Sequence, residues 1–176
     1  MKKIFLNNLF YLFIFNFLFF TLTGCGYKPS SLYQNKIIGK DIQAVVEISP
    51  KTPKKSAFLK DALNDAVYTV FGANLVNKKA NTKIILSINS SSLNALDYDE
   101  NGFPILYRSE VTLKAKIIDK HSKVRNYTVS GNYDFAISPN SIINDQLKFN
   151  SFKQACVNAI NKLLAEITKD GVKYED

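Results

Sequence analysis

The sequence is poor in the side chains that most often carry out chemistry. Among 176 residues it has no tryptophan, one histidine and two cysteines. The histidine, His121, has no cysteine or glutamate partner at ligand spacing and so makes a poor metal site. Motifs typical of serine hydrolases, phosphate-binding loops, zinc peptidases and dinucleotide-binding enzymes are also absent. We therefore expect no enzyme activity, no metal and no cofactor.

The two cysteines, Cys25 and Cys156, are not expected to pair. Cys25 ends the N-terminal segment, where lipid is expected to occupy its thiol. Cys156 is then alone on the apolar side of a predicted helix. A lone cysteine in such a place usually behaves as a small hydrophobic residue, and a reactive thiol is the less favoured alternative.

What the chain does have is the start of an exported protein. Lys2 and Lys3 precede an apolar run over residues 4–22, interrupted by three asparagines and one threonine. This layout is typical of a secretory signal peptide. The run is long enough to cross a bilayer. Its asparagines, and the lack of a basic cluster after the Gly-Cys-Gly that ends it, nevertheless favour cleavage over a transmembrane anchor.

The four residues Leu22-Thr23-Gly24-Cys25 resemble a bacterial lipobox. Small residues before Cys25 let the chain lie extended in a peptidase cleft, and a cysteine thiolate is a nucleophile that can accept a diacylglyceryl group. We expect residues 1–24 to be removed as a signal peptide and Cys25 to carry diacylglycerol and palmitate. Residues 25–40 would then be a lipid-anchored tether, and residues 41–172 a single α/β domain.

Basic residues outnumber acidic ones, and the net charge is +8. This excess favours an anionic partner, which for an exported protein means a phosphate-bearing lipid more readily than a nucleic acid. Solubility alone accounts for the same excess equally well, because net charge governs association and not fold.

Hydrophobic periodicity in the first half predicts one strand and one helix. β-branched residues predict a strand over residues 41–48, which ends before a proline. Apolar residues then recur at spacings of three and four over residues 57–71, which predicts a helix. Ser56 stands where the N-cap is expected, and Gly72 can adopt the left-handed conformation that ends a helix.

The middle of the chain predicts three more strands. An isoleucine-rich run predicts one over residues 82–90, and residues 75–76 are a candidate edge segment before it. Asn101-Gly102 predicts a tight turn. From Tyr107 onward, and again up to Phe135, apolar or small residues take the odd positions and polar residues the even ones. One face of these two strands is therefore expected to be buried and the other wet.

The alternation also predicts the register of the last two strands, because a slip of one residue would turn the apolar side chains outward. The short connection between the strands selects one of the remaining registers. The expected pairs are Ala115 with Tyr127, Leu113 with Val129, Val111 with Gly131, Glu110 with Asn132 and Arg108 with Asp134.

An amphipathic helix closes the chain. Apolar residues keep a three-four spacing from Phe152 to Ile167, and Gly171 is expected to end the helix. Residues 142–149 either extend it backwards from a cap at Ser141 or stay irregular. The order of elements predicts an α+β two-layer sandwich, with two amphipathic helices packed on one face of a four-stranded mixed or antiparallel sheet.

Together these features resemble the LPS-assembly lipoprotein (LptE) family. At residue level the resemblance lies in Leu-Thr-Gly-Cys-Gly-Tyr-Lys-Pro at 22–29 and in the distance from Asn101-Gly102 to Tyr107. The order of elements, including a helix with an Ala-Leu-x-x-Ala-Val core at 62–67, agrees over almost the whole mature chain.

The resemblance implies a lipid-anchored protein on the periplasmic side of the outer membrane, held there by acylated Cys25. Gly26, in place of aspartate, agrees with that sorting. It further implies a plug inside the lumen of the β-barrel LPS-assembly protein (LptD-type), which assists folding of the barrel and binds lipopolysaccharide in transit. The polar sheet face, rich in Thr, Ser and Asn, suits either plain solvent or such a wet lumen.

Lipopolysaccharide carries phosphates, which basic side chains can bind. The candidate contacts are Arg108, Lys114, Lys116, Lys120, Lys123 and Arg125. Pairing with Asp134 is the alternative role for Arg108, and solvation is the alternative for the lysines. No ligand site of the family is carried over, because acidic Glu100 precedes the Asn-Gly turn, where basic residues of the family are implicated in lipopolysaccharide contact.

Two other functions stay open. An auxiliary lipoprotein of an ABC-type lipid transporter can also start with a lipobox and a small α/β domain, and an apolar groove for acyl chains would favour it. An anchored periplasmic hydrolase would be favoured by a cleft that brings His121 together with carboxylates.

Overall fold

The computed structural model describes residues 38–50, 52–119, 121–138 and 141–172. The expected signal peptide, the lipidation site Cys25 and most of the expected tether lie outside these residues. So does Lys120, one of the six basic candidates. Within the described part of the chain, no helix has the length and apolar character needed to cross a membrane.

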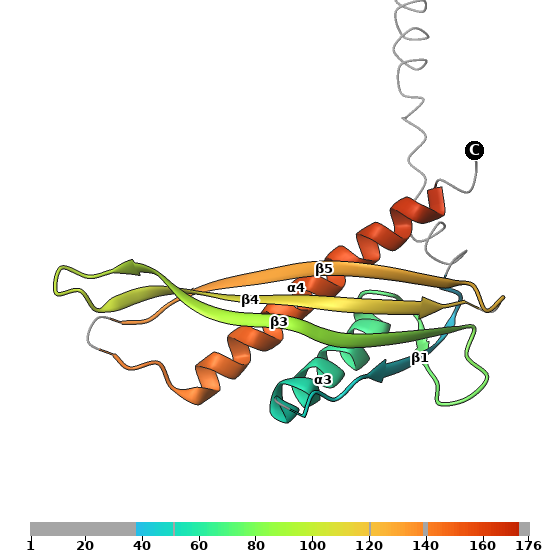
Figure 1. The fold of residues 1–176 in the computed structure, drawn as a ribbon, viewed down its shortest axis with the longest axis horizontal. Coiled ribbons are helices and arrows are strands. Elements are labelled where there is room, and N and C mark those ends of the chain that lie inside the picture. The colour runs from blue at the N-terminus through green and yellow to red at the C-terminus, as the bar shows by residue number, and fades with distance from the viewer. Residues whose placement is uncertain (1–37, 51, 120, 139–140, 173–176) are drawn as a thin grey trace, which may run out of the picture.

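The fold is an α+β sandwich of two layers (Figure 1). The sheet order is β2-β1-β3-β4-β5, in which β1 is parallel to β2 and β3, and the last three strands are antiparallel. Both helices pack on one face. The elements are β1 (Asp41–Val46), α3 (Pro53–Thr69), β2 (Asn74–Leu75), β3 (Thr82–Tyr98), β4 (Pro104–Ile118), β5 (Val124–Ala136) and α4 (Asp145–Val172).

The predicted fold class is confirmed, with one more strand than the four expected. The additional strand is the two-residue β2, which pairs with the start of β1 through Asp41–Asn74 and Ile42–Leu75. It forms at the edge segment that the sequence indicated near Leu75. The packed region also begins upstream of residue 41, because Ile38 is buried in the core and its carbonyl accepts a hydrogen bond from the Thr82 hydroxyl.

The start of α3 was predicted wrongly. The helix begins at Pro53 with Thr52 as N-cap residue, and Ser56 lies inside its first turn. Proline is well suited to the first helical position because its φ is already helical and its missing N–H has no partner there. Ser56 is buried instead, and its hydroxyl accepts a hydrogen bond from the backbone N–H of Ser49 at 3.1 Å. The helix ends at Thr69, two residues before the expected Phe71, and Gly72 follows with the left-handed conformation expected of it, at φ +57.

Strand β3 is longer than predicted, because it continues through polar residues to Tyr98. Its far half pairs with β4 across several register shifts up to Tyr98 opposite Pro104. Strand β5, however, ends at Ala136 opposite Leu106. The end of the β3–β4 hairpin therefore projects past β5 and both helices (Figure 1). The residues of β3 from Ser90 to Tyr98 are mostly exposed, so this half of the strand does not need the apolar alternation that marks a packed strand.

The β4–β5 register is the one predicted. All five expected pairs, among them Leu113 opposite Val129 and Arg108 opposite Asp134, are present without a register shift. The odd-numbered side chains of β4 from Ser109 to Ile117 are buried under the helices. The even-numbered ones face away from the helix layer, so the sheet has one packed face and one polar face.

The last helix starts earlier than its clear apolar pattern. It begins at Asp145, and the Asn144 side chain accepts a hydrogen bond from the backbone N–H of Leu147 at 2.8 Å. Asn144 is thus the cap, and not Ser141. At the other end the helix continues through Gly171 to Val172, so Gly171 does not end it.

Helix α4 crosses β5 at Gly131, where the two backbones approach very closely. A Cβ atom built on Gly131 would lie 2.2 Å from the carbonyl oxygen of Ala155 and 2.3 Å from the amide nitrogen of Ala159. Both alanines are fully buried. Glycine on the strand and alanines on the helix therefore set how deeply α4 sits on the sheet.

We expect Gly131→Ala to destabilise the fold by about 1 to 3 kcal/mol, because the added methyl group meets helix backbone that cannot rotate away. Urea denaturation of the variant and the native chain measures the difference. Ser130→Ala, on the opposite face of the same strand, removes only an exposed hydroxyl contact with Thr112. It is the matched control and should destabilise the fold less than Gly131→Ala. Equal stability of the two variants would show that the helix can lift without cost.

Candidate functional site

The polar face of the sheet offers a candidate site near the C-terminal end of β4. The strand registers place residues from three strands in two neighbouring rows on this face. In one row Lys114 lies between Ser87 and Thr128. In the other row Lys116 lies between Ile85 and Asn126. Because neighbouring strands are about 4.8 Å apart, each lysine stem is flanked on both sides by uncharged side chains.

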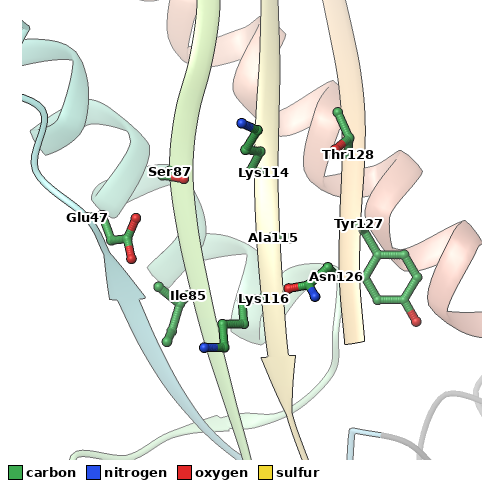
Figure 2. A pocket seen from close by; sticks show the side chains of 9 residues that line it. All are labelled: Glu47, Ile85, Ser87, Lys114, Ala115, Lys116, Asn126, Tyr127 and Thr128. Carbon is green, nitrogen blue, oxygen red and sulfur yellow. The ribbon is translucent and has the colours of Figure 1, made fainter. Parts of the chain in front are cut away.

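A shallow pocket of about 260 Å³ lies over these rows. Figure 2 shows the two lysines of β4 in its centre, with side chains of β5 on one side and of β3 on the other. Glu47, which follows β1, lines the far side of the pocket. The ring of Tyr127 points away from the lysines (Figure 2), and its hydroxyl donates a hydrogen bond to Asp170 of α4 at 2.8 Å.

The charges around this pocket are not paired with one another. Lys114, Lys116 and Glu47 are exposed, and none of them takes part in an ion pair within the described residues. The two lysines are two residues apart on one face of a strand, so their ammonium groups repel each other. The pocket therefore combines two cations, one carboxylate and several uncharged hydrogen-bonding groups.

Sequence reasoning found the lysines of the pocket but not its other residues. Glu47 was expected inside the first strand, Ser87 inside the second, and Asn126 and Thr128 on the wet face of the last. For Ser87, Asn126 and Thr128, the even or odd position in the strand correctly indicates that the side chain lies on the polar face. Only the pairing of β1 with β3 brings Glu47 to this site.

Arg108 lies on the same face but is already partnered. It forms a two-pronged contact with Asp134, with Nε 2.7 Å from Oδ1 and Nη2 2.6 Å from Oδ2. The hydrogen bond from Arg108 lowers the pKa of Asp134, and the same bond raises the pKa of Arg108. Arg108 is therefore less available for a ligand than Lys114 or Lys116, as the predicted pairing with Asp134 implied.

Arg125 and Lys123 lie at the β4–β5 turn and belong to a local network around Asp119. The Asp119 carboxylate accepts hydrogen bonds from the backbone N–H groups of His121 and Lys123 and pairs with Arg125 at 3.0 Å. Burial raises the pKa of Asp119, but the two backbone bonds and Arg125 outweigh it, so the net pKa is lowered. The structure thus gives Arg125 an internal role at this turn.

The remaining candidates have no site geometry around them. Cys156 is buried, and burial raises the pKa of its thiol to about 12, so it stays protonated and behaves as a core residue, as predicted. His121 is exposed at the turn, where its backbone rather than its ring contacts Asp119. In the described part of the chain, no three His, Cys, Asp or Glu side chains lie close enough to hold a metal ion.

The turn network predicts a pH-dependent stability. Because the pKa of Asp119 is lowered on folding, its carboxylate stabilises the fold above the ordinary carboxyl pKa of about 4, and this contribution is lost as pH falls through the folded value. Asp119→Asn should therefore lower the thermal midpoint at pH 7, and the difference from the native chain should shrink by pH 3.

Thermal unfolding followed by circular dichroism at a series of pH values measures this difference. Asp61→Asn, at an exposed aspartate on α3, is the control and should have little effect at any pH. A destabilisation by Asp119→Asn of the same size at pH 7 and pH 3 would mean that the charge of Asp119 does not matter.

Comparison with known proteins identifies the fold. The chain matches no family model and no curated protein. It is similar to the crystal structure of a candidate lipoprotein from Caulobacter crescentus CB15, with a TM-score of 0.51 and 11% identity over 81% of this chain and 96% of that one. Rare lipoprotein B from Shewanella oneidensis matches with a TM-score of 0.46 and 11% identity over 78% of this chain and 100% of that one. At such identities the similarity concerns the fold alone.

Proposed function

We propose that this chain is an outer-membrane lipoprotein that plugs and helps assemble a β-barrel for lipopolysaccharide export, and that it binds lipopolysaccharide in transit. Its role would be binding and occlusion rather than catalysis. The observation that carries the proposal is the lipobox-like Leu22-Thr23-Gly24-Cys25 in front of a fold that is also found in a candidate lipoprotein. Cys25 would hold the domain at the periplasmic side of the membrane.

The sheet supports the proposed plug. Its packed face is filled by the helices, while its outer face carries short polar side chains, such as Thr112 and Ser130, whose hydroxyls are 2.9 Å apart. A body with such a face can lie against the water-filled lumen of a barrel without burying unpaired polar groups. The exposed lysines of the pocket are the candidates for contact with lipopolysaccharide phosphates.

The alternative is an auxiliary lipoprotein of an ABC-type lipid transporter. Such a protein needs an apolar groove for acyl chains. Most of the residues that line the pocket over Lys114 and Lys116 are polar or charged, and its two lysines favour contact with a charged headgroup over binding of acyl chains. A hydrolase is favoured less, because His121 and Asp119 meet only through a backbone N–H.

The full chain, tagged at its C-terminus, tests the proposal in the outer membranes of its host. Extraction in mild detergent followed by mass spectrometry should yield a stoichiometric β-barrel and a diacylglyceryl mass on Cys25. Cys25→Ser should abolish the lipid and the barrel together, because the unanchored chain is not sorted to the outer membrane. Cys156→Ala is the matched cysteine control and should retain both.

Two results would contradict the proposal. Copurification of an inner-membrane transporter in place of a barrel would support the auxiliary lipoprotein. A native chain that keeps residues 1–24 and carries no lipid would remove the anchor on which the proposed location depends.

A further inference from the structure

The pocket on the polar sheet face has a charge arrangement that selects among phosphate ligands. In the parallel pairing of β1 with β3, Val46 lies opposite Leu86, and the backbone N–H of Glu47 donates to the Leu86 carbonyl at 2.9 Å. Glu47 therefore lies beside Ser87, which pairs with Lys114. At about 4.8 Å between strands, the backbones of Glu47 and Lys114 are about 10 Å apart, with the Ser87 side chain between them.

The two lysines form the cationic side of the pocket. Lys114 and Lys116 are separated by about 7 Å along β4 and point to the same face. Their neighbours across the strands are uncharged, whereas Arg108 on the same strand faces Asp134 directly. A phosphate between the two ammonium groups would relieve their repulsion and accept charge-assisted hydrogen bonds from both.

Uncharged donors surround the same point. Ser87 and Thr128 flank Lys114 with hydroxyl groups, and Asn126 flanks Lys116 with an amide. These groups can donate to the remaining oxygens of a phosphate. The phosphate side of the pocket therefore needs no movement of the sheet, because every donor stands on a paired strand.

Glu47 makes the pocket a poor site for a simple phosphate. Its carboxylate lies across Ser87 from Lys114 and would repel a bare phosphate, but it would attract an ammonium group. A ligand with a phosphate over the lysines and an ammonium a short linker away satisfies both sides. We propose that this pocket binds the phosphoethanolamine group, a phosphate ester that carries a primary ammonium. This inference rests on the proposed function only for the origin of that group, as part of a membrane lipid or of a decorated lipopolysaccharide.

Titration of the isotope-labelled full chain in micelles of an uncharged detergent tests the inference. The probes are O-phosphoethanolamine, inorganic phosphate and ethanolamine, and the readout is the shift of the backbone amide signals of Ser87, Asn126 and Thr128. Phosphoethanolamine should bind about threefold more tightly than phosphate, as expected for one added exposed ion pair. Ethanolamine alone should bind more weakly than either.

Variants separate the two halves of the pocket. Glu47→Gln should remove the preference for phosphoethanolamine while phosphate binds at least as well as before. Lys114→Gln and Lys116→Gln should each weaken both phosphate ligands. Lys153→Gln, which alters a lysine of α4 that pairs with Asp65 on the helix layer, should leave all three probes unaffected. These side chains are at the surface, and amide signal dispersion verifies that each variant is folded.

Equal affinity for phosphate and phosphoethanolamine, or a preference that survives Glu47→Gln, would overturn the inference. So would an absence of binding by either phosphate ligand. If bicelles that contain phosphatidylethanolamine compete with the free probe, and bicelles of phosphatidylglycerol do not, the source of the ligand is a lipid headgroup. If the free probe binds and neither kind of bicelle competes with it, the source is a phosphoethanolamine outside the bilayer. These titrations need no barrel, so phosphoethanolamine binding can be found even if no barrel copurifies. Conversely, a barrel can copurify even if the pocket does not bind phosphoethanolamine.

Discussion

Helix α4 crosses β5 at Gly131 with the two backbones in close contact, and the packing of the two layers depends on this crossing. Only a strand residue without a side chain allows the carbonyl of Ala155 and the amide of Ala159 to come so near. At that depth the apolar side chains of α4 join the odd-numbered residues of β4 and β5 in one buried cluster. A larger residue at the crossing would lift the whole helix, because a helix moves as a rigid rod.

Once the helices fill one face, the period of two along each strand decides the chemistry of the other. Every even-numbered residue of β4 faces away from the helix layer, so Arg108, Lys114 and Lys116 share one surface although they are spread over the strand. The pairing of strands then determines which charge has a partner. Arg108 faces Asp134, whereas Lys114 faces Ser87 and Thr128. The same alternation that builds the core thus leaves two cations available to an outside ligand.

The two ends of the sheet differ in a related way. At the end near the β4–β5 turn, Asp119 and Arg125 form a compact network of hydrogen bonds. At the other end, the β3–β4 ribbon carries exposed Leu96, Tyr98 and Phe103 beyond the reach of the helices. The folded body is therefore elongated (Figure 1), with a closed turn at one end and a projecting hairpin that carries a few exposed apolar side chains at the other. The pocket lies on the sheet nearer the turn, because Lys116 is two residues before the end of β4.

Local pattern in the sequence was enough to predict the fold class and the β4–β5 register, because alternation and a short turn depend on neighbours along the chain. The buried state of Cys156 and the pairing of Arg108 with Asp134 followed from the same pattern. Local signals were insufficient where two choices competed within one turn, as at Ser56 and Pro53 or at Ser141 and Asn144. Local signals did not predict the pocket, because its residues come from three different strand pairings. Glu47 meets Ser87 only because β1 inserts between β2 and β3 as a parallel strand, and such a contact depends on the path of the chain through α3, which no local spacing encodes.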